Sequence, residues 1–285
     1  MSAGVATTRG GLVRIMRSHP LTSFFVMAYT ITWLLWLPAI LWDLPRIALL
    51  PGIAIGVTGS ALVMTAAEDG RNGVGRFLHR FTQWRVGSRW YSLALLLVPL
   101  SAVAAAVLTT TSAAPVAALL PSSLPLLAAA FLHRFYLGPL WEEAGWRGFA
   151  LPRMQKRYGP LVGTLVLGLL WGFWHLAVYL PDDIATFGLA GGLAQFATFV
   201  VFSVALAFVF TWVYNNTEGS LLLAMLLHLS VNGTQTYFEL LAAEGAVGQG
   251  VAAALQNGLA LGTAAAAIVI IFATRGGLGY RGDRR

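Results

Sequence analysis

The sequence predicts an all-α fold: a polytopic membrane helix bundle of about eight transmembrane helices, with both termini in the cytoplasm. Three observations support this prediction, namely the apolar composition, the length of the apolar stretches and the placement of the basic residues. Of the 285 residues, 58% are hydrophobic and only 10% are charged, and mean hydropathy is +0.73. A soluble domain carries roughly 25% charged residues. This chain therefore has too few charged residues to cover the surface of a soluble protein, and we expect a membrane protein.

Apolar stretches of about 20 residues are long enough to span a bilayer as helices. The chain has eight, at about 21–42, 46–67, 90–110, 124–153, 160–181, 191–213, 219–239 and 250–273. The fourth is the least regular, because it contains Gly138, Pro139 and Pro152 and is interrupted by charged residues. Small residues four apart, Gly52 with Gly56 and Gly168 with Gly172, would allow neighbouring helices to approach closely.

The connections between these stretches alternate in charge. Basic residues precede the first stretch, lie between the second and third, follow the fourth and form the tail: Arg9, Arg14, Arg17, Arg71, Arg76, Arg80, Arg85, Arg89, Arg153, Lys156, Arg157, Arg275, Arg281, Arg284 and Arg285. Apart from Arg46, the alternate connections carry only acidic residues or no charge. The positive-inside rule then places both termini in the cytoplasm. We expect the membrane to be a bacterial cytoplasmic membrane.

The chain divides into three parts. Residues 1–123 hold the first spans and a basic amphipathic cytoplasmic segment at about 70–89, residues 124–239 hold the polar core, and 240–285 hold the last span and tail. In the amphipathic segment Phe77, Phe81 and Trp84 would face lipid while arginines meet headgroups. A plain basic loop explains that segment equally well.

Polar side chains inside the spans are costly and indicate a functional site. They are His133, Arg134, Glu142, Glu143, Arg147, His175, His228 and Asn232. At a rise of about 1.5 Å per residue, Glu142 lies about 18 Å from the cytoplasmic interface, and His175 lies about 22 Å from it. His228 and Asn232 lie at about 13 Å and about 19 Å by the same measure. Three separate helices thus present polar groups at similar depth.

Helical spacing indicates how these groups face. Glu143 and Arg147 are four residues apart and can pair on one face. Glu142 points about 100° away from Glu143. His228 and Asn232, also four apart, look into the same space. We expect one carboxylate held by an arginine and a second carboxylate presented to two imidazoles and an amide.

Such a set supports hydrolysis. A buried carboxylate can act as general base on a water, helped by an imidazole. A second histidine and an asparagine can stabilise an oxyanion where solvent is excluded. Glu142, His175 and His228 could also hold Zn²⁺ with one position open for water. Cysteine is absent from the chain, which excludes cysteine-ligated zinc and cysteine nucleophiles.

Other residues receive structural interpretations. His133 is expected to be a packing residue, and Arg134 either to snorkel toward the interface or to brace a carboxylate. Asp182 and Asp183 follow Pro181 and are expected in a solvated turn. Cavity walls or interface anchors are expected of Trp171, Trp174 and Trp212.

Three motifs at these positions resemble those of the CAAX protease and bacteriocin-processing family, also called CPBP or Abi. "EEAGWRG", from Glu142, resembles E-E-x-x-x-R, and "HLSVN", His228 to Asn232, fits H-x-x-x-N. "WGFWH", ending at His175, is similar to F-x-x-x-H, with Trp171 at the usual Phe position. The resemblance covers roughly 125–235.

The resemblance implies an intramembrane endopeptidase with an eight-helix core. Glu142 would activate water together with His175, while His228 and Asn232 would stabilise the oxyanion. Glu143 and Arg147 would brace the first motif. The resemblance implies either zinc-dependent or metal-free glutamate chemistry, and as partners membrane lipid and a membrane-associated peptide or protein substrate, but no nucleic acid.

Two alternatives remain. A multi-pass transporter or permease also buries Glu, His and Arg, although the two halves of the chain show no convincing repeat. A catalytically silent membrane partner is disfavoured by the presence of Glu142, both histidines and Asn232 together.

Overall fold

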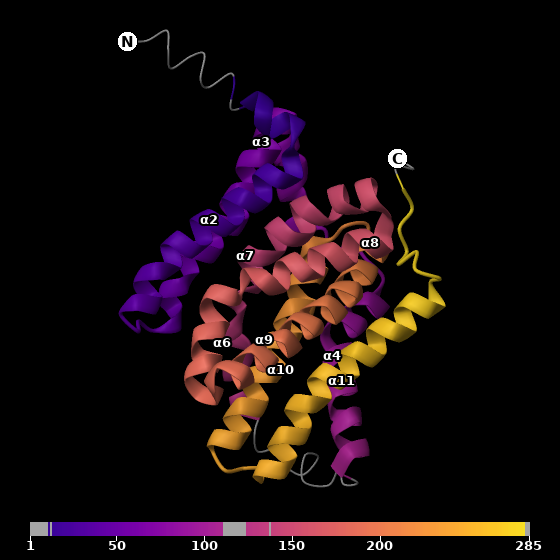
Figure 1. Cartoon of the computed structure of the whole chain (residues 1–285). Coiled ribbons are helices and arrows are strands. Elements are labelled where there is room, and N and C mark those ends of the chain that lie inside the picture. The colour runs from indigo at the N-terminus through magenta and orange to yellow at the C-terminus, as the bar shows by residue number, and fades with distance from the viewer. Residues whose placement is uncertain (1–10, 12, 111–123, 137, 283–285) are drawn as a thin grey trace.

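The protein is an all-α polytopic membrane bundle, as predicted (Figure 1). The computed structural model describes residues 11, 13–110, 124–136 and 138–282, and no strand occurs in these ranges. Its elements are α2 (Pro20–Leu41), η1 (Arg46–Leu49), η2 (Gly52–Gly59), α3 (Ser60–His79), η3 (Arg80–Thr82), α4 (Ser88–Thr110), α6 (Leu124–Tyr136), α7 (Pro139–Glu143), η4 (Ala144–Ala150), α8 (Leu151–Trp174), α9 (Leu176–Asn216), α10 (Leu221–Ala243) and α11 (Gln249–Ala273).

Within the described ranges, five helical segments are long and apolar enough to cross a membrane. They are Pro20–Leu41, Arg46–Thr82, Ser88–Leu108, Leu176–Asn216 and Gln249–Ala273. The number of eight spans stays a prediction. The irregular fourth stretch is divided among α6, α7, η4 and the start of α8. This division ends one short helix and starts another just before the acidic pair, at the depth where the polar residues were expected.

Two predicted boundaries are explained by glycine. Gly159 and Gly188 have φ angles of 77° and 71°, a region that other residues adopt only with strain. Gly159 breaks α8 one residue before the predicted fifth span. Asp182 and Asp183 lie within the helical segment before Gly188, so the expected turn at these residues is wrong. The chain turns instead at Gly188, where glycine permits a positive φ.

The basic segment at about 70–89 is a helix followed by η3, set off from the first half of α3 by a break at Gly70. Trp84 is 60% exposed, as an interfacial residue should be. The expectation that Phe77 faces lipid is wrong, because Phe77 is only 4% exposed. Its ring lies over Gly148, where a Cβ would come within 2.9 Å of it. The segment is thus packed onto the core through Phe77.

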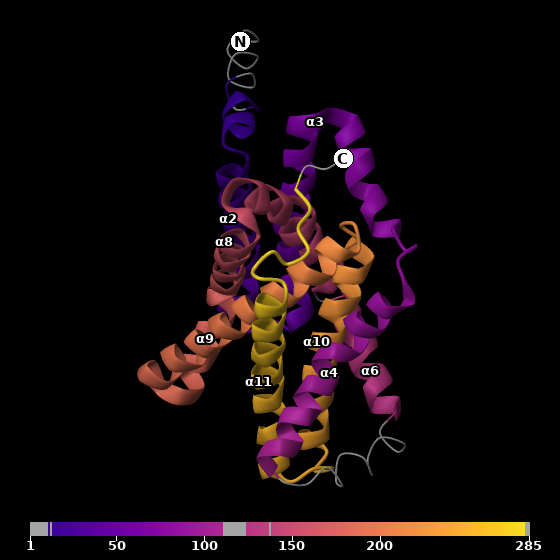
Figure 2. The ribbon, with the colours of Figure 1, turned by 90° about the vertical axis from the view of Figure 1, so that its right-hand side faces the viewer.

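Small residues do bring helices together. A Cβ at Gly168 would lie 2.9 Å from the Cα of Val204 on α9, and one at Gly56 would overlap Thr32 on α2. The same spacing at Gly258 and Gly262 lets α11 approach α4, beside it in both views (Figures 1 and 2). These contacts are tight enough that any larger side chain would force the helices apart.

Both described ends of the chain lie at one end of the bundle together with α3 (Figure 2). The arginine distribution predicts that this end is cytoplasmic. The chain has no cysteine, so single-cysteine variants label cleanly. We expect a membrane-impermeant maleimide to label Arg46→Cys in intact cells and Arg76→Cys only after permeabilisation. Both arginines are exposed members of ion pairs. The reverse pattern of labelling would show that the predicted orientation is wrong.

Candidate active site

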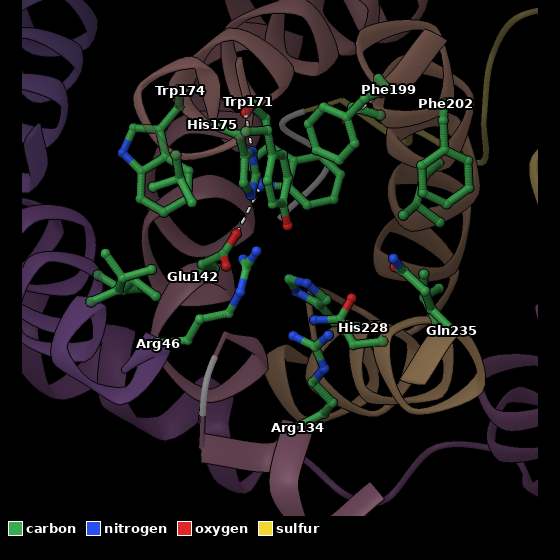
Figure 3. A pocket seen from close by; sticks show the side chains of 18 of the residues that line it. Arg46, Arg134, Glu142, Trp171, Trp174, His175, Phe199, Phe202, His228 and Gln235 are labelled. Carbon is green, nitrogen blue, oxygen red and sulfur yellow. Dashed lines mark hydrogen bonds between the residues drawn. The ribbon is translucent and has the colours of Figure 1, made fainter. Parts of the chain in front are cut away.

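The four residues predicted to be catalytic line one cavity of about 100 Å³. Glu142 comes from α7, His175 from the junction of α8 and α9, and His228 with Asn232 from α10. Figure 3 shows the labelled Glu142, His175 and His228 side chains around a common space, with Trp171 and Trp174 forming a wall. A cavity needs only about 10–15 Å³ to hold a water, so this cavity has room for several waters or for one peptide group.

Gly138 marks where three of the four side chains converge. A Cβ on Gly138 would lie 3.0 Å from Glu142 Oε1, 3.4 Å from Asn232 Nδ2 and 3.9 Å from His228 Nε2. Gly138 is also the N-cap of α7, whose first residue is Pro139, a residue well suited to that helical position. The absence of a side chain at Gly138 keeps the space between the acid, the amide and the imidazole open.

The acidic pair lies where the helical geometry widens. η4, which follows Glu143 directly, is a π-helix over Ala144–Ala150, an arrangement found most often as a single turn at functional sites. All seven of its residues are buried. The two glutamates therefore sit on the last turn of a regular helix, and Arg147 sits on the wide turn beside it.

Trp171 holds two of the candidate catalytic groups. Its indole Nε1–H donates to Glu142 Oε2 at 2.8 Å, and its backbone carbonyl accepts from His175 Nδ1 at 2.9 Å. A carbonyl oxygen only accepts, so Nδ1 of His175 carries a proton. In the neutral imidazole Nε2 is then the basic nitrogen. Trp171 thus orients the carboxylate and fixes the tautomer of His175.

Glu143 forms a separate, buried cluster behind the cavity. Its Oε1 accepts from Arg147 Nη1 at 3.0 Å and from His228 Nδ1 at 2.7 Å. The guanidinium of Arg147 lies against the nearly perpendicular rings of Trp171 and Phe210, 4.3 Å and 3.8 Å from their centroids. The predicted Glu143–Arg147 ion pair is present, and it also anchors His228. Nε2 of His228 is left toward Gly138 and Glu142.

Arg134 and His133 are the remaining polar residues predicted inside the spans. Arg134 donates to Thr236 Oγ1 and lies 3.9 Å from a carboxylate oxygen of Glu239, which favours the bracing interpretation over snorkelling. Its guanidinium also lines the cavity, as does that of Arg46. The interpretation of His133 as a packing residue is wrong, because its side chain is exposed.

Whether this cavity holds zinc stays a prediction. Among the described residues, no three His, Asp or Glu side chains lie together in a way that could hold a metal ion. Nδ1 of His175 and Nδ1 of His228 are hydrogen-bonded, and Oε2 of Glu142 accepts from Trp171. A metal could therefore be bound only by Nε2 of each histidine and Oε1 of Glu142. The steps derived below accordingly use only side chains of the chain itself.

Two contributions to the site were missed from the sequence. Trp171 was expected only as a wall, yet it donates to Glu142; an aromatic residue with an N–H at a position usually held by Phe was the available signal. Arg46 lines the cavity, and its signal was its charge, since it was the exception to the arginine distribution. Both cases involve a polar group where an apolar or acidic one was expected.

Trp171→Phe is expected to lower kcat for the reaction of this site by about tenfold or more, since a hydrogen bond to a charged group contributes about 1.5–3 kcal/mol. Trp174→Phe is the matched control. Trp174 lines the same cavity, but its indole Nε1 has no hydrogen-bond partner within the described ranges. The pH profile of kcat should change only in Trp171→Phe. Equal effects of the two variants would show that the indole N–H does not position Glu142.

Comparison with known proteins supports the resemblance. Residues 124–234 match the model of a family described as Type II CAAX prenyl endopeptidase Rce1-like. One similar curated protein is CAAX prenyl protease 2 of Methanococcus maripaludis, which is 24% identical over 105 residues. That alignment covers 36% of this chain and 39% of the archaeal protein. The matched region contains every residue of the two polar clusters described above.

Proposed function

We propose that this membrane protein, whose residues 124–234 match the CAAX protease family model, is an intramembrane endopeptidase in which Glu142 activates the attacking water. The match covers well under half of either chain. The mechanism is therefore argued from the site itself.

In the first step, a water lies between Glu142 and Nε2 of His175. Glu142 removes a proton from this water as its oxygen attacks the carbonyl carbon of the peptide bond. The hydrogen bond from Trp171 fixes one carboxylate oxygen and leaves the other, Oε1, toward the open space at Gly138. The carboxylate is thus oriented before substrate arrives, which lowers the cost of reaching the transition state.

In the second step, charge develops on the carbonyl oxygen. Nδ2 of Asn232 can donate to it directly. His228 already donates from Nδ1 to Glu143, so it can donate from Nε2 only when doubly protonated, and the adjacent carboxylate would compensate that charge. As the tetrahedral intermediate collapses, the proton held by Glu142 passes to the leaving amine nitrogen, and the C–N bond breaks.

The observation that carries this proposal is the convergence of Glu142, Asn232 and His228 on the space at Gly138. They surround a position where a peptide carbonyl could meet both a base and two hydrogen-bond donors. Transport needs no such trio, and the family match does not favour it. The name of the archaeal relative supports prenylated CAAX peptides as the first substrates to try.

The proposal is tested with purified protein in liposomes and internally quenched CAAX peptides, with and without a prenyl group. Cleavage by the wild type and a loss of at least about 100-fold in His175→Ala are expected. A chelator arm decides the subtype. Loss of activity that Zn²⁺ restores would show metal dependence, and unchanged activity would support glutamate catalysis alone. If the wild type cleaves neither peptide, the proposal of CAAX peptidase activity fails.

A further inference from the structure

A second, larger pocket of about 420 Å³ continues from the catalytic cavity. The two spaces share six lining residues: Arg46, Arg134, Tyr179, Phe199, Phe202 and Gln235. The larger pocket extends beyond them along α9, α10 and α11, and we call this extension the amide groove, defined by Gln195, Thr198, Phe238, Gln256 and Leu259. A chain that reached Glu142 through the shared residues would pass over the amide groove.

Two glutamines of the amide groove make no intramolecular hydrogen bond within the described residues. Gln195 on α9 and Gln256 on α11 are exposed and lie inside helices long and apolar enough to cross the membrane. An amide facing hydrocarbon without a partner costs about 2–7 kcal/mol. These two amides therefore face water or a polar ligand.

Both arginines that line the groove are already paired. Arg46 contacts Asp182 at 3.3 Å, and Arg134 lies 3.9 Å from Glu239, which also accepts from Gln235 at 3.0 Å. The lining carries two arginines and the two carboxylates of Asp183 and Glu239, so neither sign dominates. A phosphate or a phospholipid headgroup would call for unpaired cations. The charge balance favours a neutral ligand, and the two glutamine amides favour one with polar groups.

The main chain of a polypeptide has that chemistry. Each peptide group presents one N–H donor and one C=O acceptor, and each glutamine amide presents the complementary acceptor and donors. We propose that the amide groove holds an extended segment of the substrate by its main chain, through Gln195 and Gln256, on one side of the bond placed at Glu142. The proposal rests on the proposed endopeptidase function. It assigns recognition of the main chain, and therefore tolerance of side-chain sequence, to this groove.

The test compares Gln195→Leu and Gln256→Leu with Gln249→Leu. Gln249 is exposed on α11 but lines neither pocket. With the quenched CAAX peptide, each groove variant is expected to raise KM about fivefold, in keeping with a net hydrogen bond of about 1 kcal/mol. Its kcat should stay within about twofold of the wild type, and Gln249→Leu should change neither constant.

A peptide series locates the contact. Replacing single main-chain amides of the peptide with esters should raise KM for the wild type at one or two positions. At those positions the ester should have no further effect in Gln195→Leu or Gln256→Leu. If both glutamine variants cleave the peptide with unchanged KM, the proposed binding role of the amide groove is wrong, whereas the proposed peptidase function is not affected.

A binding measurement tests the amide groove even if the proposed peptidase activity is absent. If the wild type does not cleave the peptide, fluorescence polarisation measures its affinity for the uncleaved peptide. Weaker binding to Gln195→Leu and Gln256→Leu than to Gln249→Leu would still support a polypeptide-binding groove. Equal affinities for all three variants would overturn it.

Discussion

Glu142→Gln is expected to lower kcat for peptide cleavage by about 10²–10⁴-fold, the usual contribution of a positioned general base. The glutamine side chain keeps the volume of the glutamate, and its carbonyl oxygen can still accept from Trp171 as Glu142 Oε2 does. It cannot take a proton from water. The effect should therefore appear in kcat, while KM stays close to that of the wild type.

Glu244→Gln serves as the control, because Glu244 is exposed and lines neither pocket. Helical content and elution volume in detergent should be the same for both variants and the wild type. If Glu142→Gln retained a tenth or more of wild-type kcat, another group would have to activate the water. His175 would be the next candidate, because its Nε2 is the basic nitrogen of the ring.

The meeting of distant helices could be predicted because burying polar groups in a membrane is costly. A sequence that places Glu142, His175 and His228 at similar depth has few ways to satisfy them except by bringing them together. The structure places all three around one cavity. Their roles in catalysis remain predictions. Depth and spacing therefore indicated which helices would meet.

The hydrogen-bond partners of the individual side chains could not be predicted, because they depend on rotations of the helices by a few tens of degrees. Helical periodicity placed Glu142 opposite both imidazoles, but Nδ1 of His228 bonds to Glu143. The start of the π-helix at Ala144 changes the turn on which Arg147 sits, and no residue in that stretch indicates a wider turn. Phe77 likewise looked like an interfacial residue, because its packing against Gly148 depends on tertiary structure.

Glu143→Gln is expected to destabilise the protein by about 3–5 kcal/mol, the typical cost of removing one partner from a buried ion pair. Both side chains are almost fully buried, at 0% and 1% exposure for Glu143 and Arg147. The variant would leave the guanidinium without its hydrogen-bonded carboxylate. The free energy of unfolding in mixed micelles measures the loss. Asp69→Asn, which removes an exposed pair with Arg76, should change it by less than about 1 kcal/mol.

The double variant Glu143→Gln, Arg147→Met separates an unpaired charge from lost packing. Methionine fills much of the space against Trp171 and Phe210 without a charge, so the double variant should be more stable than Glu143→Gln alone. A higher free energy of unfolding in the double variant would show that the unpaired buried cation causes the loss of stability in Glu143→Gln. A double variant less stable than either single one would instead show that the hydrogen bond from His228 Nδ1 to Glu143 and the packing of the guanidinium hold the fold. Peptide cleavage should stay low in the double variant even if stability returns, because His228 would still lack the carboxylate that balances its charge.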